Sequence, residues 1–289
     1  MDLAVATRAE TFERLRDNLT EYGIAARSIQ ADSRWLPLRP TSEEFEGFDV
    51  GFVYPSRLME GAVVASHLDV PWVNDRSAVL TSRNKAGVLT RLGKAGLPIP
   101  ASVMVSNPTD ETERQAAFEA IGPPVVVKPN SATRGVGVAR ADDLDSFLGL
   151  CDYLDLAHEF PATGDRSFLV QEFLPEARDY RAMVIDGDYV GAVERRLPPE
   201  LRDAGRWKHN VHRSADAQPV DLDSELQSLA EDTATALEID FLGVDILVSE
   251  DRAVVNETNA RPTIDDRAKY RPGFYDTLAD LIEKTAIRR

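Results

Sequence analysis

The chain has 289 residues, 43% of them hydrophobic, and one cysteine, Cys151, so it can bury a large core but cannot form a disulfide within itself. It has no apolar run close to the roughly 18 residues that span a bilayer and begins without the features of a signal peptide, so we expect a cytoplasmic protein outside the membrane. Its 49 acidic residues outnumber 33 basic ones, and the formal charge of -16 disfavours nucleic acid and anionic membranes as partners and favours a halophile-like adaptation to high salt.

The first eighty residues alternate between short apolar runs and amphipathic stretches. Helical spacing of hydrophobic residues predicts helices over 9–22 and 57–68. Apolar runs predict strands over residues 3–6, 24–29, 48–53 and 71–74. This β-α-β-β-α-β order predicts an N-terminal α/β domain over residues 1–80 with a parallel sheet. A further helix is expected over 75–95, and the glycine and prolines of residues 96–100 then punctuate the chain.

Residues 81–289 are expected to form a second domain with two lobes, over about 97–169 and about 170–289. In the first lobe we expect strands over 101–105, 125–129 and 168–173 and helices over 110–121 and 142–154. In the second we expect a hairpin that turns at Asp186-Gly187-Asp188. A helix over 223–238 and a last hairpin, 243–248 with 253–258, follow it.

A lysine ends one of the buried strands and opens a small polar loop. Lys128 is followed by residues 130–138, which include Gly135 and Gly137. Exposed backbone N–H groups in such a loop can surround an anion, and the lysine adds a positive charge. The Gly-Lys-Ser/Thr of a P-loop is absent, and the first strand lacks the glycines of a dinucleotide-binding turn. The pattern therefore indicates either a phosphate site or an ordinary surface hairpin.

The last predicted hairpin carries three oxygen-bearing side chains. Asp245 lies mid-strand among apolar neighbours, where a carboxylate needs a cation or hydrogen-bond donors. Glu257 and Asn259, two residues apart, share one face of the other strand. A five-residue loop over 249–253 would place Asp245 across from Glu257, whereas a four-residue loop would place them on opposite faces. Three hard oxygen ligands suit Mg²⁺ or Mn²⁺, and a hydrogen-bonded polar cluster is the alternative.

Taken in order, the motifs of this chain resemble those of the ATP-grasp superfamily and, within it, the RimK-like glutamate ligases. The resemblance extends over nearly the whole chain, and its specificity lies in the ordered set rather than in any one motif. The matching segments are Lys85 on its helix, Val126-Val127-Lys128 with the glycine loop, Val170-Gln171-Glu172-Phe173-Leu174, Asp179-Tyr180-Arg181, Glu194-Arg195-Arg196, Asn210-Val211-His212-Arg213, Gly243-Val244-Asp245-Ile246-Leu247 and Asn256-Glu257-Thr258-Asn259-Ala260.

The resemblance implies an ATP-grasp fold with an N-terminal Rossmann-like lobe, and an ATP-dependent ligase that joins a carboxylate to an amine through an acylphosphate. It implies ATP and Mg²⁺ (or Mn²⁺) as cofactors, glutamate as one substrate, and a small molecule or a protein tail as the acceptor. Asp245, Glu257 and Asn259 would bind the metal, and Arg196 or Arg213 would act in catalysis. The nucleotide would contact Lys85, Lys128, Gly135, Gly137, Glu172, Phe173, Leu174, Asp179, Lys208, His209 and Asn210.

Two departures from the family pattern leave the acceptor open. Arg213 is followed by Ser-Ala-Asp where many RimK-like enzymes have two glycines, and Arg261-Pro262-Thr263 stands where many have Ser-Pro-Gly. Arg261 is thus a candidate to pair with a substrate carboxylate. A different ATP-grasp ligase acting on amino acids or dipeptides is one alternative function. A catalytically inactive nucleotide-binding regulator is another, but retention of the metal ligands and of both lysines argues against it.

Overall fold

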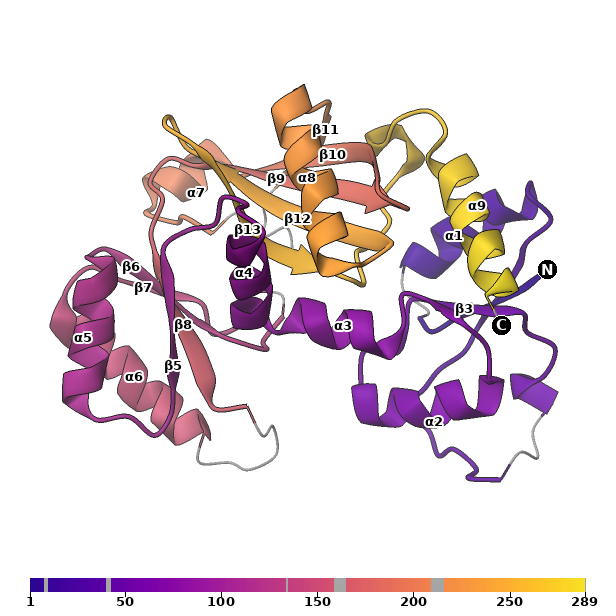
Figure 1. Ribbon diagram of the computed structural model, residues 1–289, viewed down its shortest axis with the longest axis horizontal. Coiled ribbons are helices and arrows are strands. Elements are labelled where there is room, and N and C mark those ends of the chain that lie inside the picture. Colours follow the sequence, from indigo (N-terminus) through magenta and orange to yellow (C-terminus); the bar gives the residue numbers. More distant parts are fainter. Residues whose placement is uncertain (8–9, 40–42, 134, 159–164, 209–215, 289) are drawn as a thin grey trace.

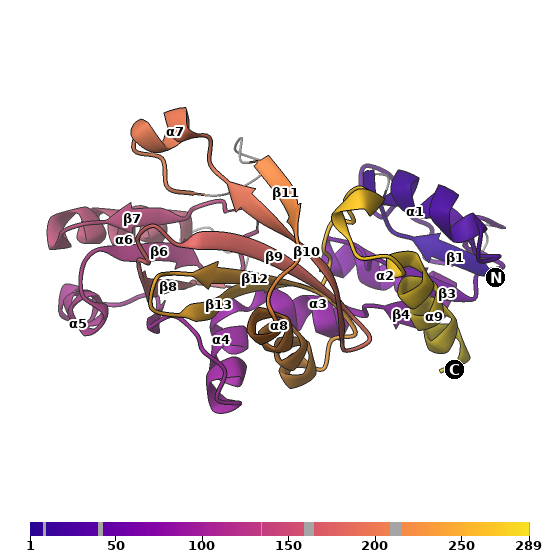
Figure 2. The same cartoon turned by 90° about the horizontal axis from the view of Figure 1, so that it is seen from above.

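Three sheets organise the chain in the computed structural model, which describes residues 1–7, 10–39, 43–133, 135–158, 165–208 and 216–288. Figure 1 shows the sheets arranged along the long axis of the molecule, and Figure 2 shows the same arrangement from above. Among the described residues, no helix combines the length and apolar character needed to cross a bilayer.

The N-terminal sheet is parallel, in the order β2-β1-β3-β4, as the sequence predicts. Its described elements are β1 (Asp2–Val5), α1 (Glu10–Thr20), β2 (Ala25–Ser28), η1 (Glu43–Phe45), β3 (Val50–Phe52), α2 (Leu58–Leu68) and β4 (Trp72–Val73). The C-terminal helix α9 (Phe274–Ile287) completes this lobe, because its Tyr275 and Leu278 are buried with Leu3 in one core. Figure 1 shows α9 beside α1.

The prediction of a single helix over residues 75–95 is wrong, because this segment forms two helices, α3 (Arg76–Arg83) and α4 (Lys85–Lys94). Asn84 separates the two helices. Its backbone is not helical, with φ -80° and ψ 85°, and its side chain accepts a hydrogen bond of 2.9 Å from the N–H of Gly87. This side-chain cap begins a new helix, and it makes Lys85 the first residue of α4.

The second sheet is antiparallel, in the order β5-β8-β6-β7. Its strands are β5 (Ser102–Ser106), β6 (Val125–Pro129), β7 (Ala139–Ala141) and β8 (Ser167–Glu172). Helices α5 (Glu111–Ile121) and α6 (Leu144–His158) bury Phe118 and Phe147 against it, together with Phe168 of β8. The glycine loop therefore connects two neighbouring strands, β6 and β7, of a well-packed lobe.

The third sheet has five antiparallel strands in the order β11-β10-β9-β12-β13. Asp186 and Gly187 join β9 to β10 with φ of 50° and 93°, the conformation that a two-residue hairpin requires. The remaining elements are β9 (Arg178–Ile185), β10 (Asp188–Arg196), α7 (Pro199–Asp203), β11 (Asp216–Val220), α8 (Ser224–Leu237), β12 (Phe241–Val248), β13 (Ala253–Asn259) and η3 (Arg267–Lys269).

A β-bulge sets the register of the last hairpin. Val248 pairs with Ala253, so the connecting loop is four residues, 249–252, which is the alternative that would by itself place Asp245 and Glu257 on opposite faces. Ile246 pairs with Val255, but Asp245 pairs with Glu257. Asn256 is thus the extra residue on β13, and a bulge of this kind reverses the face on which the following side chains lie. Asp245 and Glu257 are therefore direct cross-strand neighbours in spite of the short loop.

An asparagine ties the first lobe to the third sheet. The buried side chain of Asn74 donates hydrogen bonds to the carbonyls of Phe241 and Ala260, the latter at 2.7 Å. It also accepts one of 3.2 Å from the N–H of Phe241. Phe241 begins β12 and Ala260 follows β13, so this contact holds the two strands that carry Asp245 and Glu257 against the N-terminal lobe.

Candidate functional site

One cleft of about 1780 Å³ is lined by residues of all three lobes. The first lobe contributes Thr7 and Gln30, the second contributes Lys128 and the glycine loop, and the third contributes the face of β9, β10, β12 and β13. Of the predicted site residues in the described segments, all but Gly137 line this cleft: Lys85, Lys128, Gly135, Glu172, Phe173, Leu174, Asp179, Arg196, Lys208, Asp245, Glu257 and Asn259. His209, Asn210 and Arg213 lie outside the described residues.

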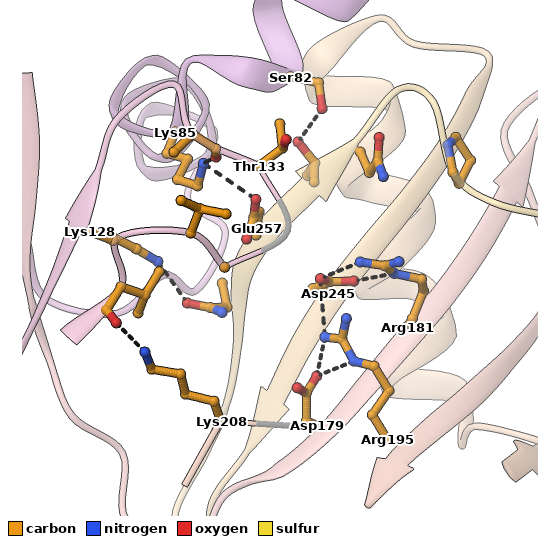
Figure 3. A pocket seen from close by; sticks show the side chains of 18 of the residues that line it. Ser82, Lys85, Lys128, Thr133, Asp179, Arg181, Arg195, Lys208, Asp245 and Glu257 are labelled. Atoms are coloured by element: carbon orange, nitrogen blue, oxygen red, sulfur yellow. Dashed lines mark hydrogen bonds and ion pairs between the residues drawn. The ribbon is translucent and has the colours of Figure 1, made fainter. Parts of the chain in front are cut away.

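Two buried lysines face the cleft beside Glu257 (Figure 3). The Lys85 ammonium lies 3.4 Å from a Glu257 carboxylate oxygen and donates to the carbonyls of Asn130, at 3.3 Å, and Ala132. The Lys128 ammonium donates to the side-chain oxygen of Asn256 at 3.1 Å. Burial lowers the pKa of Lys128 from 10.5 to about 8; Glu257 opposes this shift and Lys85 adds to it.

The glycine loop approaches its own strand closely. Gly135 and Gly137 have φ of 65° and 74°, a region that favours glycine. A Cβ on Gly137 would lie 2.7 Å from Cγ of Pro129, so no larger residue fits without movement. Lys208 donates to the carbonyl of Val138 at the end of the loop. The loop therefore has a fixed contact at each side of the cleft, through Lys85 and through Lys208.

The strand end at residues 172–174 forms an aromatic wall of the cleft. The Glu172 carboxylate accepts a hydrogen bond of 2.7 Å from the N–H of Ala101 and pairs with Arg252, so its side chain joins the second lobe to the β12–β13 loop. The Phe173 ring lies edge-to-face with Trp207 at 5.6 Å, and the guanidinium of Arg140 lies 4.3 Å from its centroid. Trp207 is a cleft residue that the sequence analysis did not identify.

Two arginines and two aspartates form a cluster on the cleft face of the third sheet (Figure 3). Arg181 of β9 pairs across the sheet with Asp245 and binds it through two hydrogen bonds, Nε to Oδ1 at 2.7 Å and Nη2 to Oδ2 at 2.8 Å. Arg195 of β10 lies 3.1 Å from Asp245 Oδ2 and also donates to Asp179. We refer to these four side chains as the arginine–aspartate cluster.

The two carboxylates of this cluster differ in basicity. Burial raises the pKa of Asp179 to about 6, against the opposing charge of Arg195. Burial alone would also raise the pKa of Asp245, but two guanidiniums bond to it and bring its pKa down to about 2. Both carboxylates are therefore mainly ionised at neutral pH, and Asp179 is the one that gains a proton first on acidification. The carboxylate of Asp179, which is expected to contact the nucleotide, is held by Arg195, and its nucleotide role stays a prediction.

The chemistry of the predicted metal ligands fits a hard divalent cation. Glu257 has a side chain that is 34% exposed and lies on the cleft. The side-chain oxygen of Asn259 accepts one hydrogen bond, of 2.8 Å, from the N–H of Arg261, and it has a second lone pair. In the described part of the chain, no three His, Cys, Asp or Glu side chains gather as a metal site. A metal here would therefore depend on Asn259 and on oxygens that a ligand brings.

Two arginines expected on the substrate side have partners within the protein. Arg196 bonds Glu194, which Arg178 also binds at 3.0 and 3.1 Å, and the Arg178 bonds lead in lowering the pKa of Glu194 to about 2. Arg261 lines the cleft and donates to the carbonyl of Tyr54 in the first lobe. Arg196 and Arg261 both line the cleft, but their contacts indicate a binding role less directly than those of Arg181 do.

Ser82 positions the end of the metal-ligand strand. Its hydroxyl accepts a hydrogen bond of 3.0 Å from the N–H of Ala260 and lies 3.2 Å from the Thr258 hydroxyl. The backbone of Ala260 is thus held on one side by Ser82 and on the other by Asn74. No local sequence signal marks this pair. Arg181 and Arg195 belong to two segments that carry the family resemblance, and Asp179 and Arg181 alternate on one strand and therefore share a face.

Solved structures share this architecture over the entire chain. A RimK domain ATP-grasp protein from Sphaerobacter thermophilus DSM 20745 is 22% identical, with a TM-score of 0.69 over 99% of this chain and 100% of that one. A D-alanine–D-alanine ligase from Bacillus anthracis is 17% identical, with a TM-score of 0.72 over 100% and 98%. These likenesses establish an ATP-grasp fold, as the motif order led us to expect.

The sequence comparison defines the family. The RimK-like ATP-grasp domain matches residues 82–273, and the chain therefore belongs to the RimK-like ATP-grasp family. A probable alpha-L-glutamate ligase of Thioalkalivibrio sulfidiphilus is 32% identical over 202 residues, which are 67% of this chain and 60% of that protein. One of Enterobacter sp. strain 638 is 28% identical over 250 residues, 83% and 75% of the two chains. The match thus spans less than two thirds of the first relative's length.

Proposed function

We propose that this protein is an ATP-dependent ligase that joins a carboxylate to an amine through an acylphosphate, with L-glutamate as one substrate. The observation that carries the proposal is the meeting, in one cleft, of two buried lysines with the facing carboxylates of Asp245 and Glu257. Lysine charges suit phosphates, and carboxylates suit the divalent cation that accompanies them. The names of the glutamate ligases in the same family favour glutamate.

In this proposal the nucleotide spans the cleft from its aromatic wall to the lysines. The adenine lies at residues 172–174 beside Leu247, and the phosphates lie between Lys85, Lys128 and the glycine loop. A bound polyphosphate would restore the charge of Lys128, whose pKa is lowered by burial. Lys208 supports the loop through Val138. The loop would act as a lid, because an acylphosphate hydrolyses in water and has to be kept dry.

Asp245, Glu257 and Asn259 would hold Mg²⁺ or Mn²⁺. A bound divalent cation would neutralise charge that develops on the transferring phosphoryl group. Ser82 and Asn74 hold the backbone that follows these ligands, so the protein fixes where the cation sits. Correct placement of the reacting groups, rather than a nucleophilic side chain, is the main contribution of such a site.

The reaction has two bond-forming steps. A carboxylate oxygen of the acid substrate attacks the γ-phosphorus of ATP, the bond to the β-phosphate oxygen breaks, and ADP leaves. The amine then attacks the acyl carbon, and inorganic phosphate leaves as the amine loses a proton. The arginines on the third sheet would stabilise the anionic tetrahedral intermediate and hold the acid. Arg196 and Arg213 keep their predicted catalytic roles within this proposal.

Phosphate release with isotope transfer tests the reaction type. We expect ADP release that depends on an acid and an amine, and transfer of ¹⁸O from the labelled carboxylate to the released phosphate. A panel of amino acids separates glutamate from the substrates of a dipeptide ligase. The acceptor follows from mass spectrometry of a cell extract incubated with the protein, ATP and labelled glutamate. Phosphate without ¹⁸O from any acid would refute the acylphosphate.

A pair of variants tests the site itself. Glu257→Gln removes a metal-ligand charge and should abolish ADP release, while Glu283→Gln, on the exposed face of α9, should leave it unchanged. Both variants are isosteric and remove one negative charge, so a general effect of charge would appear in both. Undiminished ADP release in Glu257→Gln would contradict the metal role assigned to this carboxylate.

A further inference from the structure

Arg181 holds Asp245 in the geometry with which a guanidinium binds any carboxylate. Two nearly parallel bonds, of 2.7 and 2.8 Å, join the two groups. The Arg181 side chain is 28% exposed and lines the cleft, whereas those of Arg195 and Asp245 are 10% and 6% exposed. Of the two arginines in the arginine–aspartate cluster, Arg181 is therefore the one that a ligand in the cleft can reach.

Asp245 binds Arg181 and is also a proposed ligand of the metal, and these two roles compete for the same oxygens. Within the cluster, Asp179 and Asp245 face Arg181 and Arg195, so two acids meet two bases. A divalent cation on Asp245 would add positive charge next to both guanidiniums and draw on the oxygens that Arg181 occupies. Arg195 has a second carboxylate, because it also bonds Asp179. Arg181 has Asp245 as its carboxylate partner among the ion pairs of the described residues, so the cation acts mainly on the Arg181–Asp245 pair.

A partly buried guanidinium that loses its carboxylate is left in an unfavourable state. A carboxylate from the cleft would restore the paired bonds and offset the charge of the cation. Two other cleft arginines are less suited to this exchange, because Arg196 is bonded to Glu194 and Arg261 to the Tyr54 carbonyl. Arg181 thus offers a reachable, carboxylate-shaped position, and this position becomes available when the metal binds.

Resting on the proposed ligase function, we propose that Arg181 exchanges Asp245 for the carboxylate of the acid substrate when the metal–nucleotide complex binds. Arg181 is then a specificity residue for the acid, and Asp245 occupies the carboxylate position until the metal arrives. Because such coupling is reciprocal, the metal–nucleotide complex should strengthen acid binding, and the acid should strengthen metal binding, by the same factor.

The test measures binding rather than turnover. Mn²⁺ is titrated into the ADP-bound full-length protein, followed by electron paramagnetic resonance, and L-glutamate binding is measured by calorimetry with and without MnADP. We expect glutamate to bind about tenfold more tightly with MnADP, in the usual range of coupling between sites. In Arg181→Met, Mn²⁺ should bind more tightly, because its competitor for Asp245 is gone, and glutamate should bind equally weakly in both states.

A purely structural role for Arg181 predicts the opposite sign for the metal. Without the two hydrogen bonds from Arg181, Asp245 would be misplaced and Mn²⁺ affinity would fall. Arg271→Met is the matched control, because Arg271 pairs with Asp221 outside the cleft and its loss should change neither affinity. If Arg181→Met does not fold, Arg181→Lys retains one charge without the paired bonds, and it should weaken glutamate while leaving Mn²⁺ binding at least as tight.

Two outcomes overturn the proposal. Mn²⁺ affinity that falls or stays unchanged in Arg181→Met refutes the competition for Asp245. Glutamate affinity in the unmodified protein that is the same with and without MnADP refutes the exchange. Both results leave the proposed ligase function standing if MnADP itself binds. Failure of the unmodified protein to bind MnADP would instead refute the proposed function.

Discussion

We predict that Lys128 makes nucleotide binding depend on pH. Burial lowers the pKa of its ammonium to about 8, and this ammonium donates a hydrogen bond to a neutral amide, that of Asn256. A lysine must carry its proton to bind phosphate, so affinity should be nearly full at pH 7 and below and should fall as the pH rises through 8. The protonated fraction is about 0.76 at pH 7.5 and about 0.03 at pH 9.5, which predicts a loss of affinity of about 25-fold.

Calorimetric titration of ADP at constant Mg²⁺ between pH 7.5 and 9.5 measures this effect. Near pH 8.5 the binding heat should also vary with the ionisation enthalpy of the buffer, because binding takes up a proton. Lys128→Arg remains charged throughout and should abolish both dependences. Lys284→Arg, an exposed residue paired with Asp186, is the matched control and should behave as the unmodified protein. A flat profile in the unmodified protein, or the same fall in Lys128→Arg, would refute the reasoning.

Two further substitutions test the supports of the cleft. Asn74→Ala leaves three buried backbone groups of Phe241 and Ala260 without partners and should lower the free energy of unfolding by about 3 kcal/mol in urea titrations, whereas Asn18→Ala, which loses a single bond to Arg14, should cost under about 1 kcal/mol. Gly137→Ala adds a Cβ against Pro129 at a positive φ, a strain of about 1–2 kcal/mol. It should weaken ADP roughly tenfold, while Gly149→Ala in α6, with open space at its Cβ, should not; equal ADP affinity in the two would argue against a role for the loop.

Local patterns in the sequence predict much of the fold, because each lobe is built from signals that act over short distances. The hairpin at Asp186-Gly187 is one example, since both turn residues take positive φ and few residue types do so readily. No helix is predicted at α9, although the helical spacing of Phe274, Leu278 and Ile282 is also a local signal. The surface on which this helix packs is not encoded locally, because it consists of strands at the other end of the chain. Local signals therefore predict elements better than they predict which elements meet.

The candidate site shows the same limit at the level of single residues. The oxygen ligands on β12 and β13 can be identified from their sequence spacing, but the pairing of Asp245 with Glu257 depends on the bulge at Asn256. Nothing in the residue type of Asn256 predicts it, because many bulges involve a glycine and this one does not. The amide of Asn256 also accepts from Lys128 of another sheet. The bulge thus serves a contact that only the folded chain creates.

The charged groups of the cleft lie on two sides, one with the lysines and one with the arginines, and the two sides differ in how far carboxylates neutralise them. On the lysine side, Asn256 and the carbonyls of the glycine loop offer dipoles and Glu257 offers a carboxylate, but burial lowers the pKa of Lys128 more than Glu257 raises it. On the arginine side, Asp245 remains ionised because guanidiniums surround it. In the proposed function, a polyphosphate would supply further negative charge beside the lysines. Its divalent cation would engage Asp245 and leave a guanidinium for a second anion, so that one cleft would accommodate a metal nucleotide and a carboxylic acid side by side.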